Sequence, residues 1–379
     1  MAKDRLKGLI LSGGKGSRLR PFTYSGAKQL VPIANKPVLF YAIEDLVGCG
    51  IRDIGIVVGD TREQVMAAVG DGSRWGARVT YVQQEAPLGI AHAVKVAADF
   101  LVRGPFVLYL GDNLVLGGVA SCVERFRSEA SNCQLLLYHV ANPQSFGVAD
   151  MVDGHVARVV EKPSRPPSDL AVIGVYMFDQ HVFPVVDRLR PSARGELEIA
   201  DTIQCLIDAG LTVQAQVLER YWMDTGKMGD ILEANAAVLD VLPAANEGSI
   251  DSASRVEGKV ILEPGAQVES SVLHGPLIIG REARVVDSEV GPHTSIDHHC
   301  LVRDSRITDS VVMENTVIEG VGPRIEGSLI GRFVELRGDG RGWSEGRLCV
   351  TLGDHSRITT EAREETGSVT SSLRREPRP

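Results

Sequence analysis

The chain has 379 residues, 44% hydrophobic and 23% charged, as expected for a globular protein long enough for two domains. Its 40 basic and 49 acidic residues give a net charge of −9, which argues against a nucleic-acid partner. No stretch approaches the roughly 20 apolar residues that cross a membrane, and the first apolar run is too short for a signal peptide. The six cysteines lack metal-binding spacing, so we expect reduced thiols in a cytoplasmic protein.

The first predicted element is a short strand followed by a glycine-rich basic loop. The apolar run at residues 9–11 is too short for a buried helix, which favours a buried β-strand. Three glycines follow that allow positive φ and close approach of a ligand: Gly13, Gly14 and Gly16. Three cations can reach the hollow formed by the loop amides: Lys15, Arg18 and Lys28. This combination suits a polyphosphate, and a surface turn with solvated cations is the alternative.

The loop lacks two common phosphate-binding patterns and resembles a third. No GxxxxGK[ST] follows the strand, and the glycines do not fit GxGxxG. Residues 8–37 instead resemble the signature of the sugar-1-phosphate nucleotidyltransferases, and residues 13–21, 28–30 and 35–37 are similar to their glucose-1-phosphate thymidylyltransferase branch. The resemblance implies a loop that binds a nucleoside triphosphate. The nucleotide-binding residues of the loop are then Leu11, Ser12, Gly13, Gly14, Gly16, Ser17 and Arg18.

Up to about residue 240, apolar strand patterns alternate with helical patterns. The predicted strands include residues 54–58, 79–82, 106–110, 134–140 and 172–178. This alternation predicts an α/β fold with a mainly parallel, Rossmann-like sheet covered by helices. Ligands of such sheets bind beyond the carboxyl ends of the strands, so the residues that follow each strand are the candidates for a site.

The nucleobase contact is predicted in residues 81–92, which follow one of these strands. The amide of Gln84 has a donor and an acceptor, which match the N3–H and carbonyl edge of thymine or uracil. By its spacing from Gly89, Gln84 aligns with the base-reading glutamine of the family that the chain resembles, and Gly89 would let the base lie against the main chain. We expect His92 to be a structural residue rather than a catalyst.

Two aspartates are candidates for a metal site. Asp112 and Asp224 each follow an apolar stretch and precede a turn that contains or adjoins glycine. Mg²⁺ takes oxygen ligands, usually one or two carboxylates together with substrate phosphates. Either aspartate alone could merely cap a turn or a helix. In the family that the chain resembles, the two corresponding aspartates jointly bind the catalytic Mg²⁺, and Asp112 also lies at the nucleotide.

A sugar-phosphate site is expected between the two aspartates in the sequence. The resemblance implies that this site is formed by Gly147, Glu161, Lys162, Val172 and Gly174. Glu161 can accept hydrogen bonds from sugar hydroxyls, and Lys162 can neutralise the sugar phosphate. Many members of the branch have a second glutamate where this chain has Val160, so one outer sugar contact differs. Residues 194–201 resemble the segment that orders the floor of the sugar pocket.

The second half has a different period. Seven aliphatic residues fall on a six-residue spacing: Val260, Ala266, Val272, Ile278, Val290, Ile296 and Val302. A period of six is typical of a hexapeptide, left-handed parallel β-helix, in which each coil buries its face against the next. We therefore predict a catalytic domain at residues 1–245, a β-helix domain at residues 246–358 and a flexible tail at residues 359–379. We expect the β-helix to be covered by the catalytic domain or by another subunit of a homo-oligomer.

The resemblance implies an enzyme that transfers a thymidylyl group from dTTP to glucose 1-phosphate, giving dTDP-glucose and pyrophosphate for deoxysugar biosynthesis. No protein nucleophile is needed, so catalysis consists of positioning and charge stabilisation by Mg²⁺ and three cations: Arg18, Lys28 and Lys162.

Three alternatives remain open from the sequence. A uridylyltransferase differs by one substrate methyl group, which is worth only about 1–3 kcal/mol in an apolar pocket. A bifunctional enzyme with a hexapeptide acyltransferase would need a catalytic histidine, and the candidates by residue type alone are His274, His293, His298 and His299. A non-catalytic binding protein is disfavoured because both predicted metal ligands and all three loop cations are present.

Overall fold

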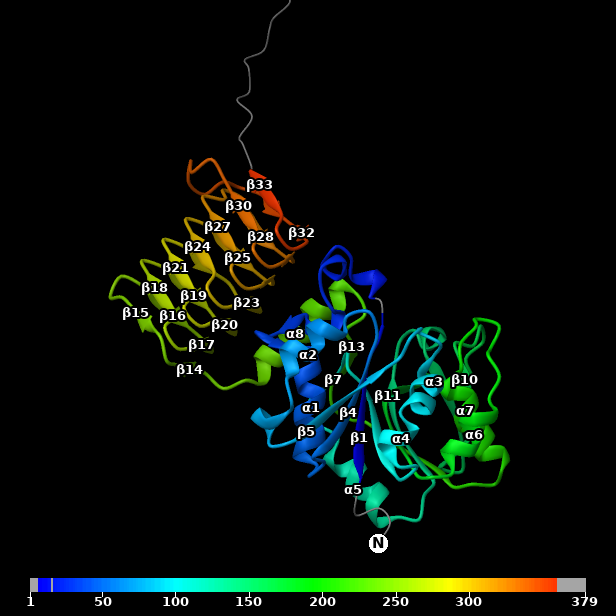
Figure 1. The fold of residues 1–379 in the computed structure, drawn as a ribbon. Helices are drawn as coiled ribbons and strands as arrows, with labels where there is room; N and C mark the ends of the chain where they lie inside the picture. The colour runs from blue at the N-terminus through cyan, green and yellow to red at the C-terminus, as the bar shows by residue number, and fades with distance from the viewer. Residues whose placement is uncertain (1–5, 15, 360–379) are drawn as a thin grey trace, which may run out of the picture.

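The structure, a computed structural model, describes residues 6–14 and 16–359. Lys15, one of the predicted loop cations, and the predicted tail from residue 360 onward lie outside the described residues. An α/β part and a stack of triangular coils lie against each other (Figure 1). Within the part of the chain that the structure describes, none of the helices has the length and apolarity needed to cross a membrane.

A nine-stranded mixed sheet forms the centre of the α/β part. Its main path follows the order β10 (His155–Glu161), β9 (Gly147–Val152), β11 (Leu170–Phe178), β6 (Phe106–Leu110), β1 (Lys7–Ser12), β4 (Asp53–Val58) and β5 (Arg78–Gln83). Strands β8 (Cys133–His139) and β12 (Val213–Val217) extend it beside β11. Strands β6, β1, β4 and β5 are parallel, whereas β11 is antiparallel to each of its neighbours. The predicted α/β fold with a Rossmann-like sheet is confirmed. Strand β11 separates the parallel strands β6, β1, β4 and β5 from the parallel pair β8 and β12, and β9 and β10 form an antiparallel pair.

Both faces of this sheet are covered by helices, because its central strands are apolar on both sides. Leu9 points into one core and its neighbour Ile10 into the other, as alternation along a strand requires. Helices α3 (Ile90–Val96), α4 (Ala98–Leu101), α6 (Val182–Arg188) and α7 (Ile199–Asp208) cover the face of Leu9. Helices α1 (Val38–Gly48), α2 (Arg62–Val69) and α5 (Ala120–Ser128) cover the face of Ile10.

Smaller elements connect these layers at the carboxyl edge of the sheet. Two short antiparallel ribbons are formed by β2 (Pro32–Ile33) with β3 (Lys36–Pro37) and by β7 (Asn113–Val115) with β13 (Trp222–Asp224). The 3₁₀ turns are η2 (Ser17–Leu19), η3 (Phe22–Tyr24), η4 (Lys28–Leu30), η5 (Ser73–Trp75) and η6 (Pro143–Ser145). Helix α8 (Met228–Val241) follows β13 and leads into the coils.

The coils form three parallel sheets, consistent with the predicted left-handed parallel β-helix. The first sheet contains β14 (Ala245–Asn246), β17 (Val260–Leu262), β20 (Leu277–Ile279), β23 (Thr294–Ile296), β26 (Val311–Val312), β29 (Leu329–Ile330) and β32 (Thr351–Leu352). The second contains β15 (Ser249–Ile250), β18 (Gln267–Glu269), β21 (Arg284–Val286), β24 (Leu301–Arg303), β27 (Val317–Glu319), β30 (Glu335–Arg337) and β33 (Arg357–Thr359). The third contains β16 (Arg255–Glu257), β19 (Val272–His274), β22 (Glu289–Val290), β25 (Arg306–Thr308), β28 (Arg324–Glu326) and β31 (Arg347–Leu348).

The coil repeat is 17 residues at the start of the stack, so a strict six-residue spacing drifts out of register. Leu277 pairs with Val260, and Thr294 pairs with Leu277. A ladder of serines fixes this repeat at one corner. The hydroxyl of each serine accepts a hydrogen bond from the backbone N–H of the next, at 3.1 to 3.2 Å: Ser254, Ser271, Ser288 and Ser305.

Because the six-residue spacing drifts, two of the residues predicted to face inward are wrong. Leu273 rather than Val272 is buried in the core of the coils, and Ile278 faces outward.

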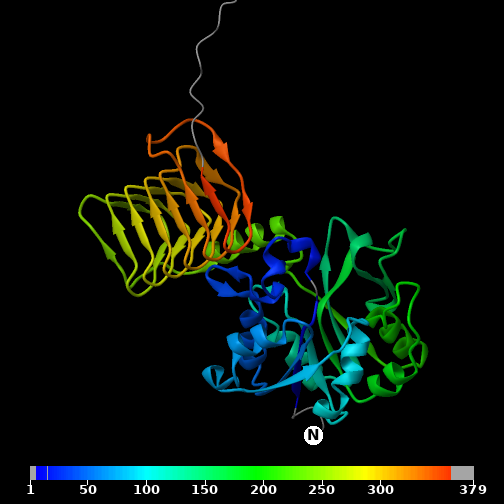
Figure 2. The same ribbon diagram turned by 45° about the horizontal axis from the view of Figure 1, so that its top comes forward.

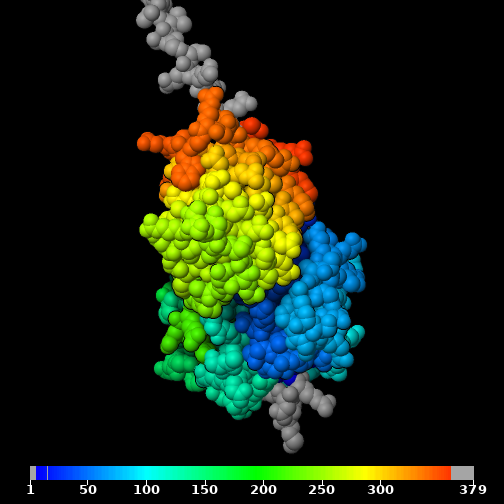
Figure 3. Space-filling view, turned by 90° about the vertical axis from the view of Figure 1, so that its left-hand side faces the viewer, coloured from blue at the N-terminus to red at the C-terminus, as the bar shows by residue number. Residues whose placement is uncertain are grey.

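The first sheet of the β-helix packs directly on the α/β part, as Figure 3 also shows in space-filling form. One apolar cluster joins Ile278 of the coils to Val38 and to helix α8. Asn235 of α8 is fully buried between the two parts, where it accepts hydrogen bonds from Ala34 N and Ser295 Oγ, at 2.9 and 2.6 Å. The α/β part therefore covers one face of the β-helix, which is one of the two alternatives that the sequence left open.

Candidate active site

Two distant segments bring Asp112 and Asp224 to the same edge of the sheet. Asp112 follows β6, and Asp224 ends β13, where it pairs across the ribbon with Asn113. Thr225 binds the carbonyl of Asp112 with both its backbone N–H and its hydroxyl, at 3.1 and 2.8 Å. The two carboxylates, 112 residues apart in the sequence, are thus held together by main-chain contacts.

The charged side chains around these aspartates lie close enough to shift one another's pKa. The ammonium of Lys28 forms an ion pair with Asp112, and both groups are largely buried. Burial acts to lower the pKa of Lys28, but the attraction of Asp112 and Asp224 outweighs it and raises that pKa. Burial acts to raise the pKa of Asp112, but Lys28 outweighs it and holds that pKa below its ordinary value. Burial, and after it the charge of Asp112, raise the pKa of Asp224 to about 6, so the ionised form of Asp224 is less stable here than in water.

Asn113 joins three strands around the site. Its Oδ1 accepts a hydrogen bond from the indole Nε1 of Trp222 at 2.7 Å and one from the backbone N–H of Gly174 at 3.3 Å. Its Nδ2 donates to Asp112 Oδ1 at 3.2 Å. A Cβ at position 174 would lie 2.7 Å from Asn113 Oδ1, so only glycine allows β11 to approach this closely. Asn113 therefore orients the carboxylate of Asp112 and the wall of the cavity together.

The glycine-rich loop lies beside this pair, with Leu11 and Ser12 at the end of β1. Of its three glycines, all within the described residues, Gly16 alone has positive φ, at 60°, which corrects the prediction for Gly13 and Gly14. Gly14 instead gives room to Lys28, since a Cβ there would lie 2.9 Å from Lys28 Cε.

Ser17 and Arg18 begin the turn η2 and are exposed. A Cβ at Gly226 would lie 2.8 Å from the guanidinium of Arg18. Arg18 therefore reaches the loop that carries Asp224.

Two buried polar atoms next to the loop have no hydrogen-bond partner among the described residues. They are the hydroxyl of Ser12 and the side-chain oxygen of Gln29. Buried polar groups are usually satisfied, and exceptions indicate a ligand, an ion or water. These atoms fit the prediction that a polar ligand binds at the loop.

The predicted nucleobase residues lie on the far side of the loop. Gln84 follows β5 and is buried, and its Nε2 lies 2.9 Å from His92 Nδ1. The expectation that His92 is structural agrees with this contact. Gly89 has φ of 103°, and a Cβ there would lie 2.4 Å from the carbonyl oxygen of Leu197. The close approach of the main chain at Leu197 is thus a reason for this glycine that the sequence did not show.

The predicted sugar-phosphate residues form the opposite wall of the cavity. Gly147 begins β9 and pairs with Glu161 at the end of β10. Lys162 has φ of 42°, a left-handed conformation that is costly for a side chain other than glycine and is often found at functional sites. Its Nζ lies 3.5 Å from Glu161 Oε1, and Arg194 also reaches this carboxylate, at 3.2 Å. Val172 and Gly174 line the same wall from β11.

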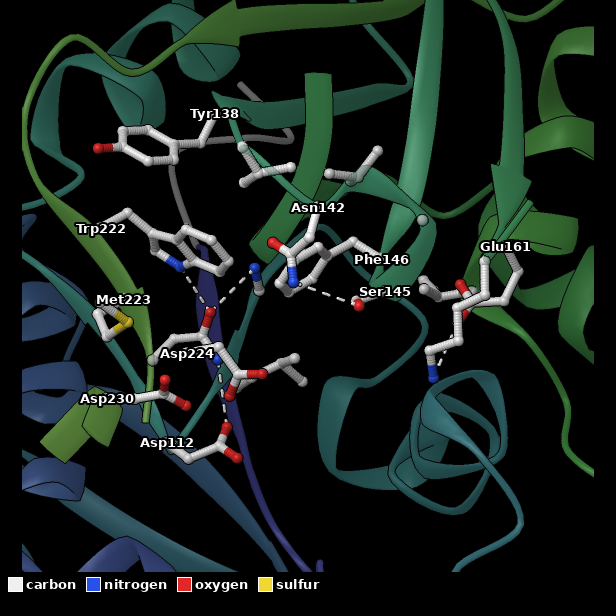
Figure 4. A pocket seen from close by; sticks show the side chains of 18 of the residues that line it. Asp112, Tyr138, Asn142, Ser145, Phe146, Glu161, Trp222, Met223, Asp224 and Asp230 are labelled. Atoms are coloured by element: carbon white, nitrogen blue, oxygen red, sulfur yellow. Dashed lines mark hydrogen bonds and ion pairs between the residues drawn. The ribbon is translucent and has the colours of Figure 1, made fainter. Parts of the chain in front are cut away.

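A single cavity of about 680 Å³ unites the metal and sugar-phosphate candidates. Figure 4 shows Asp112 and Asp224 at one end of the cavity and Glu161 at the other, with Phe146 between them and Trp222 above the aspartates. Arg18, Lys28 and Lys162 also line it, whereas Gln84 and Gly89 are not among its lining residues.

The sequence prediction missed several lining residues. Tyr138, Asn142 and Ser145 lie at or beyond the end of β8, and Asp230 lies in the first turn of α8. Strand β8 runs in the same direction as β6, so the rule that ligands bind beyond strand ends would have found the residues after β8. No comparable sequence pattern points to Asp230.

The donor set fits a hard divalent cation. Asp112 and Asp224 offer only oxygen atoms, and the raised pKa of Asp224 marks negative charge that a cation would stabilise. Among the described residues, no group of three or more His, Cys, Asp or Glu side chains is arranged to hold a metal. Two carboxylates completed by substrate phosphates are the usual arrangement for Mg²⁺.

This fold and this charge arrangement define a transferase acting on phosphorylated substrates. Residues 7–241 match the sequence model of the nucleotidyl transferase family, and the chain belongs to this family. It is 48% identical to a glucose-1-phosphate thymidylyltransferase of Streptomyces griseus, over 93% of this chain and 99% of that protein. It is 45% identical to a protein of the same name from Streptomyces antibioticus, over 94% and 100% of the two chains.

A solved structure is similar to the α/β part. It is described as a putative glucose-1-phosphate thymidylyltransferase of Bacillus anthracis in complex with a sucrose. The TM-score is 0.60 at 35% identity, with 63% of this chain and 98% of that chain covered.

Proposed function

We propose that this chain is a glucose-1-phosphate thymidylyltransferase. It transfers the thymidylyl group of dTTP to glucose 1-phosphate. A phosphate oxygen of the sugar attacks the α-phosphorus, a new P–O bond forms, and the bond to the β-phosphate breaks in line. The products are dTDP-glucose and pyrophosphate, and no protein nucleophile is required.

The observation that carries the proposal is one cavity with cations at both ends. Lys28 and Arg18 lie near the two aspartates, and Lys162 lies beside Glu161 at the other end. A transfer between two phosphates needs both anions to be held at short range against their mutual repulsion. This distribution of cations meets that requirement.

The nucleotide is assigned to the glycine-rich loop. The amides of residues 13–18 and the guanidinium of Arg18 hold the triphosphate, and Gln84 hydrogen-bonds the edge of the base. The unpartnered Ser12 hydroxyl and Gln29 oxygen support a polar ligand at this loop.

Mg²⁺ is assigned to Asp112 and Asp224. When bound there, the ion neutralises charge on the α-phosphate. Asn113 orients Asp112 by the hydrogen bond to its carboxylate, and Lys28 neutralises the same carboxylate and lies between the two phosphate sites.

Glucose 1-phosphate is assigned to the wall around Glu161. Glu161 accepts hydrogen bonds from sugar hydroxyls, while Lys162 binds the phosphate and directs its oxygen at the nucleotide. Gly147 and Gly174 leave room for the ring, since neither position has a side chain that would fill the cavity.

Pyrophosphate release measured over a panel of nucleoside triphosphates and sugar 1-phosphates tests this function. The expected result is the highest kcat/KM with dTTP and glucose 1-phosphate in Mg²⁺. Preference for UTP over dTTP would make the chain a uridylyltransferase instead. Release with no pair of substrates would overturn the proposal.

We further propose that residues 1–245 are the catalytic domain, that residues 246–358 are the β-helix domain, and that the enzyme is a cytoplasmic homo-oligomer. The six free cysteines support a reducing compartment.

The first coil supports an oligomer, because its strands are exposed and leave Ile250 and Val256 at an unpaired sheet edge. Light scattering tests the assembly. The substitutions Ile250→Lys and Val256→Lys together should reduce the subunit number, and an unchanged mass would exclude this edge as the interface.

A further inference from the structure

The segment that carries Lys28 lies between the active site and the β-helix. Figure 2 shows the dark-blue N-terminal residues in contact with the last coils. An apolar cluster packs Leu19, Phe22 and Val31 against Val311 and Leu329 of the coils, and all five are buried. The segment after the phosphate loop therefore has one face on the site and the other on the β-helix.

Two polar contacts hold this segment on either side of Lys28. The hydroxyl of Ser25 donates to Asp354 Oδ2 at 2.7 Å, and Arg332 Nη2 donates to the carbonyl of Leu30 at 3.2 Å. Asp354 also accepts the backbone N–H of Arg332 at 2.8 Å. Glu314 holds the guanidinium of Arg332 from the other side, at 3.1 Å. Arg332 and Asp354 thus form one preorganised pair on the coils.

The α/β part also holds this segment, since Ala27 is buried in the core on the face of Ile10 and Leu30 packs against that core. Gln64 of α2 accepts the N–H of Ala27 at 2.8 Å and donates to the carbonyl of Ser25 at 2.9 Å. Thr23 donates to the carbonyl of Gly16 at 2.7 Å, so a displacement of the segment is passed on to the phosphate loop. Lys28 itself faces inward to Asp112.

We propose that Arg332 and Asp354 are positioning residues for the transfer reaction: they hold residues 25–30 so that the ammonium of Lys28 meets the substrate phosphates. This inference rests on the proposed function for its catalytic consequence. A lysine side chain is long and flexible, so the position of its charge depends on a fixed backbone at its base. A displacement of about 1 Å at a reacting centre can cost up to about 100-fold in rate.

The test compares two arginines of the β-helix in the full-length chain. Arg332→Met removes the contact to Leu30. Arg337→Met is the matched control, because Arg337, like Arg332, forms ion pairs with two carboxylates, here Glu319 and Glu335, and its ion pairs stay within the coils. We expect Arg332→Met to lower kcat roughly tenfold and to leave the KM for glucose 1-phosphate within about twofold. Arg332→Lys should restore part of the rate, and Arg337→Met should match the wild type.

A double variant separates positioning from general stability. If Arg332 acts through Lys28, its substitution should have little further effect on the residual kcat of Lys28→Met. A full additional tenfold loss in that background, or equal rates for Arg332→Met and Arg337→Met, would overturn the inference. If Arg332→Met does not fold, Ser25→Ala replaces it in the test, because it removes the hydrogen bond to Asp354. A fall in kcat of twofold or more supports the inference, and an unchanged kcat overturns it.

Amide hydrogen exchange makes the test independent of catalysis. In Arg332→Met the amides of residues 26–31 should exchange at least about tenfold faster, with no change in Arg337→Met. If the wild type releases no pyrophosphate, the proposed function is wrong, but faster exchange would still show that Arg332 holds the segment. Unchanged exchange would overturn the positioning role whatever the activity.

Discussion

In the β-helix each coil packs on the preceding coil, so residues about one coil apart become neighbours, as Val260 and Leu277 do. In the α/β part the site unites Arg18, Asp112 and Asp224, which lie far apart in the sequence. A repetitive stack spreads its stability over many similar contacts, whereas the site depends on a few charges with no substitute. Substitutions in the site should therefore affect activity most, and substitutions in the coils should affect stability.

The largest effect is expected for the metal aspartates. Asp112→Asn and Asp224→Asn each replace a charged ligand by a neutral amide, and each should lower kcat/KM by at least about 100-fold while the fold is retained. Pyrophosphate release at limiting Mg²⁺ and circular dichroism measure both. Asp53→Asn, which breaks an exposed ion pair with Arg78, is the control. A near wild-type rate for either site variant would refute the metal assignment.

Substitutions at the two ends of the cavity should change different kinetic constants. Arg18→Ala should lower kcat about 100-fold, because it removes a charge at the triphosphate. Lys162→Ala should raise the KM for glucose 1-phosphate about tenfold with a smaller change in the KM for dTTP. Initial rates with each substrate varied in turn provide the test. Equal changes of both KM values in Lys162→Ala would disprove this division of roles.

Two alanine substitutions in the coils compare the inward face of the β-helix with the face that packs on the α/β part. Ile318 and Leu329 are both fully buried, but Ile318 lies in the coil core and Leu329 packs on the segment that carries Lys28. Each change to alanine should cost about 2–5 kcal/mol of unfolding free energy. Only Leu329→Ala should also lower kcat, by roughly three- to tenfold. Thermal melting measures the loss of stability, and initial rates measure kcat. Equal kcat values for the two variants would show that the face on the α/β part has no special effect on the reaction.

The smallest effect on activity is expected from a partly buried carboxyl outside the site. Burial raises the pKa of Asp45 to about 7, although Tyr109 donates a hydrogen bond to it at 2.9 Å. The folded chain therefore keeps this proton where the unfolded chain, with a pKa of about 3.9, has lost it. The stabilising contribution is present below pH 4 and is lost as the pH rises to 7.

Asp45→Asn should thus be about 4 kcal/mol more stable than the wild type at pH 8, at about 1.4 kcal/mol per pKa unit, and nearly equal to it at pH 4. Urea unfolding at both pH values measures this difference. Asp53→Asn again serves as the control. A constant difference between pH 4 and pH 8 would show that Asp45 does not titrate in this range.

The sequence alone determined the features that local chemistry encodes. A short apolar run before glycines predicts the strand that ends at Ser12, and carboxylates after strands predict Asp112 and Asp224 as site residues. A six-residue spacing of aliphatic side chains predicts a stack of coils. Each of these follows from the geometry of a few adjacent residues, which is the same wherever the segment lies in the fold.

Only the tertiary structure decided which segments meet. The ribbon of β7 and β13 brings Asp224 to Asp112, and the main chain at Leu197 explains Gly89. The coil repeat of 17 residues depends on pairing between coils, so a single coil in the sequence does not reveal it. Contacts such as Arg332 with Leu30 join residues 302 positions apart. They arise from the packing of two completed surfaces, and no pattern within either segment encodes that packing.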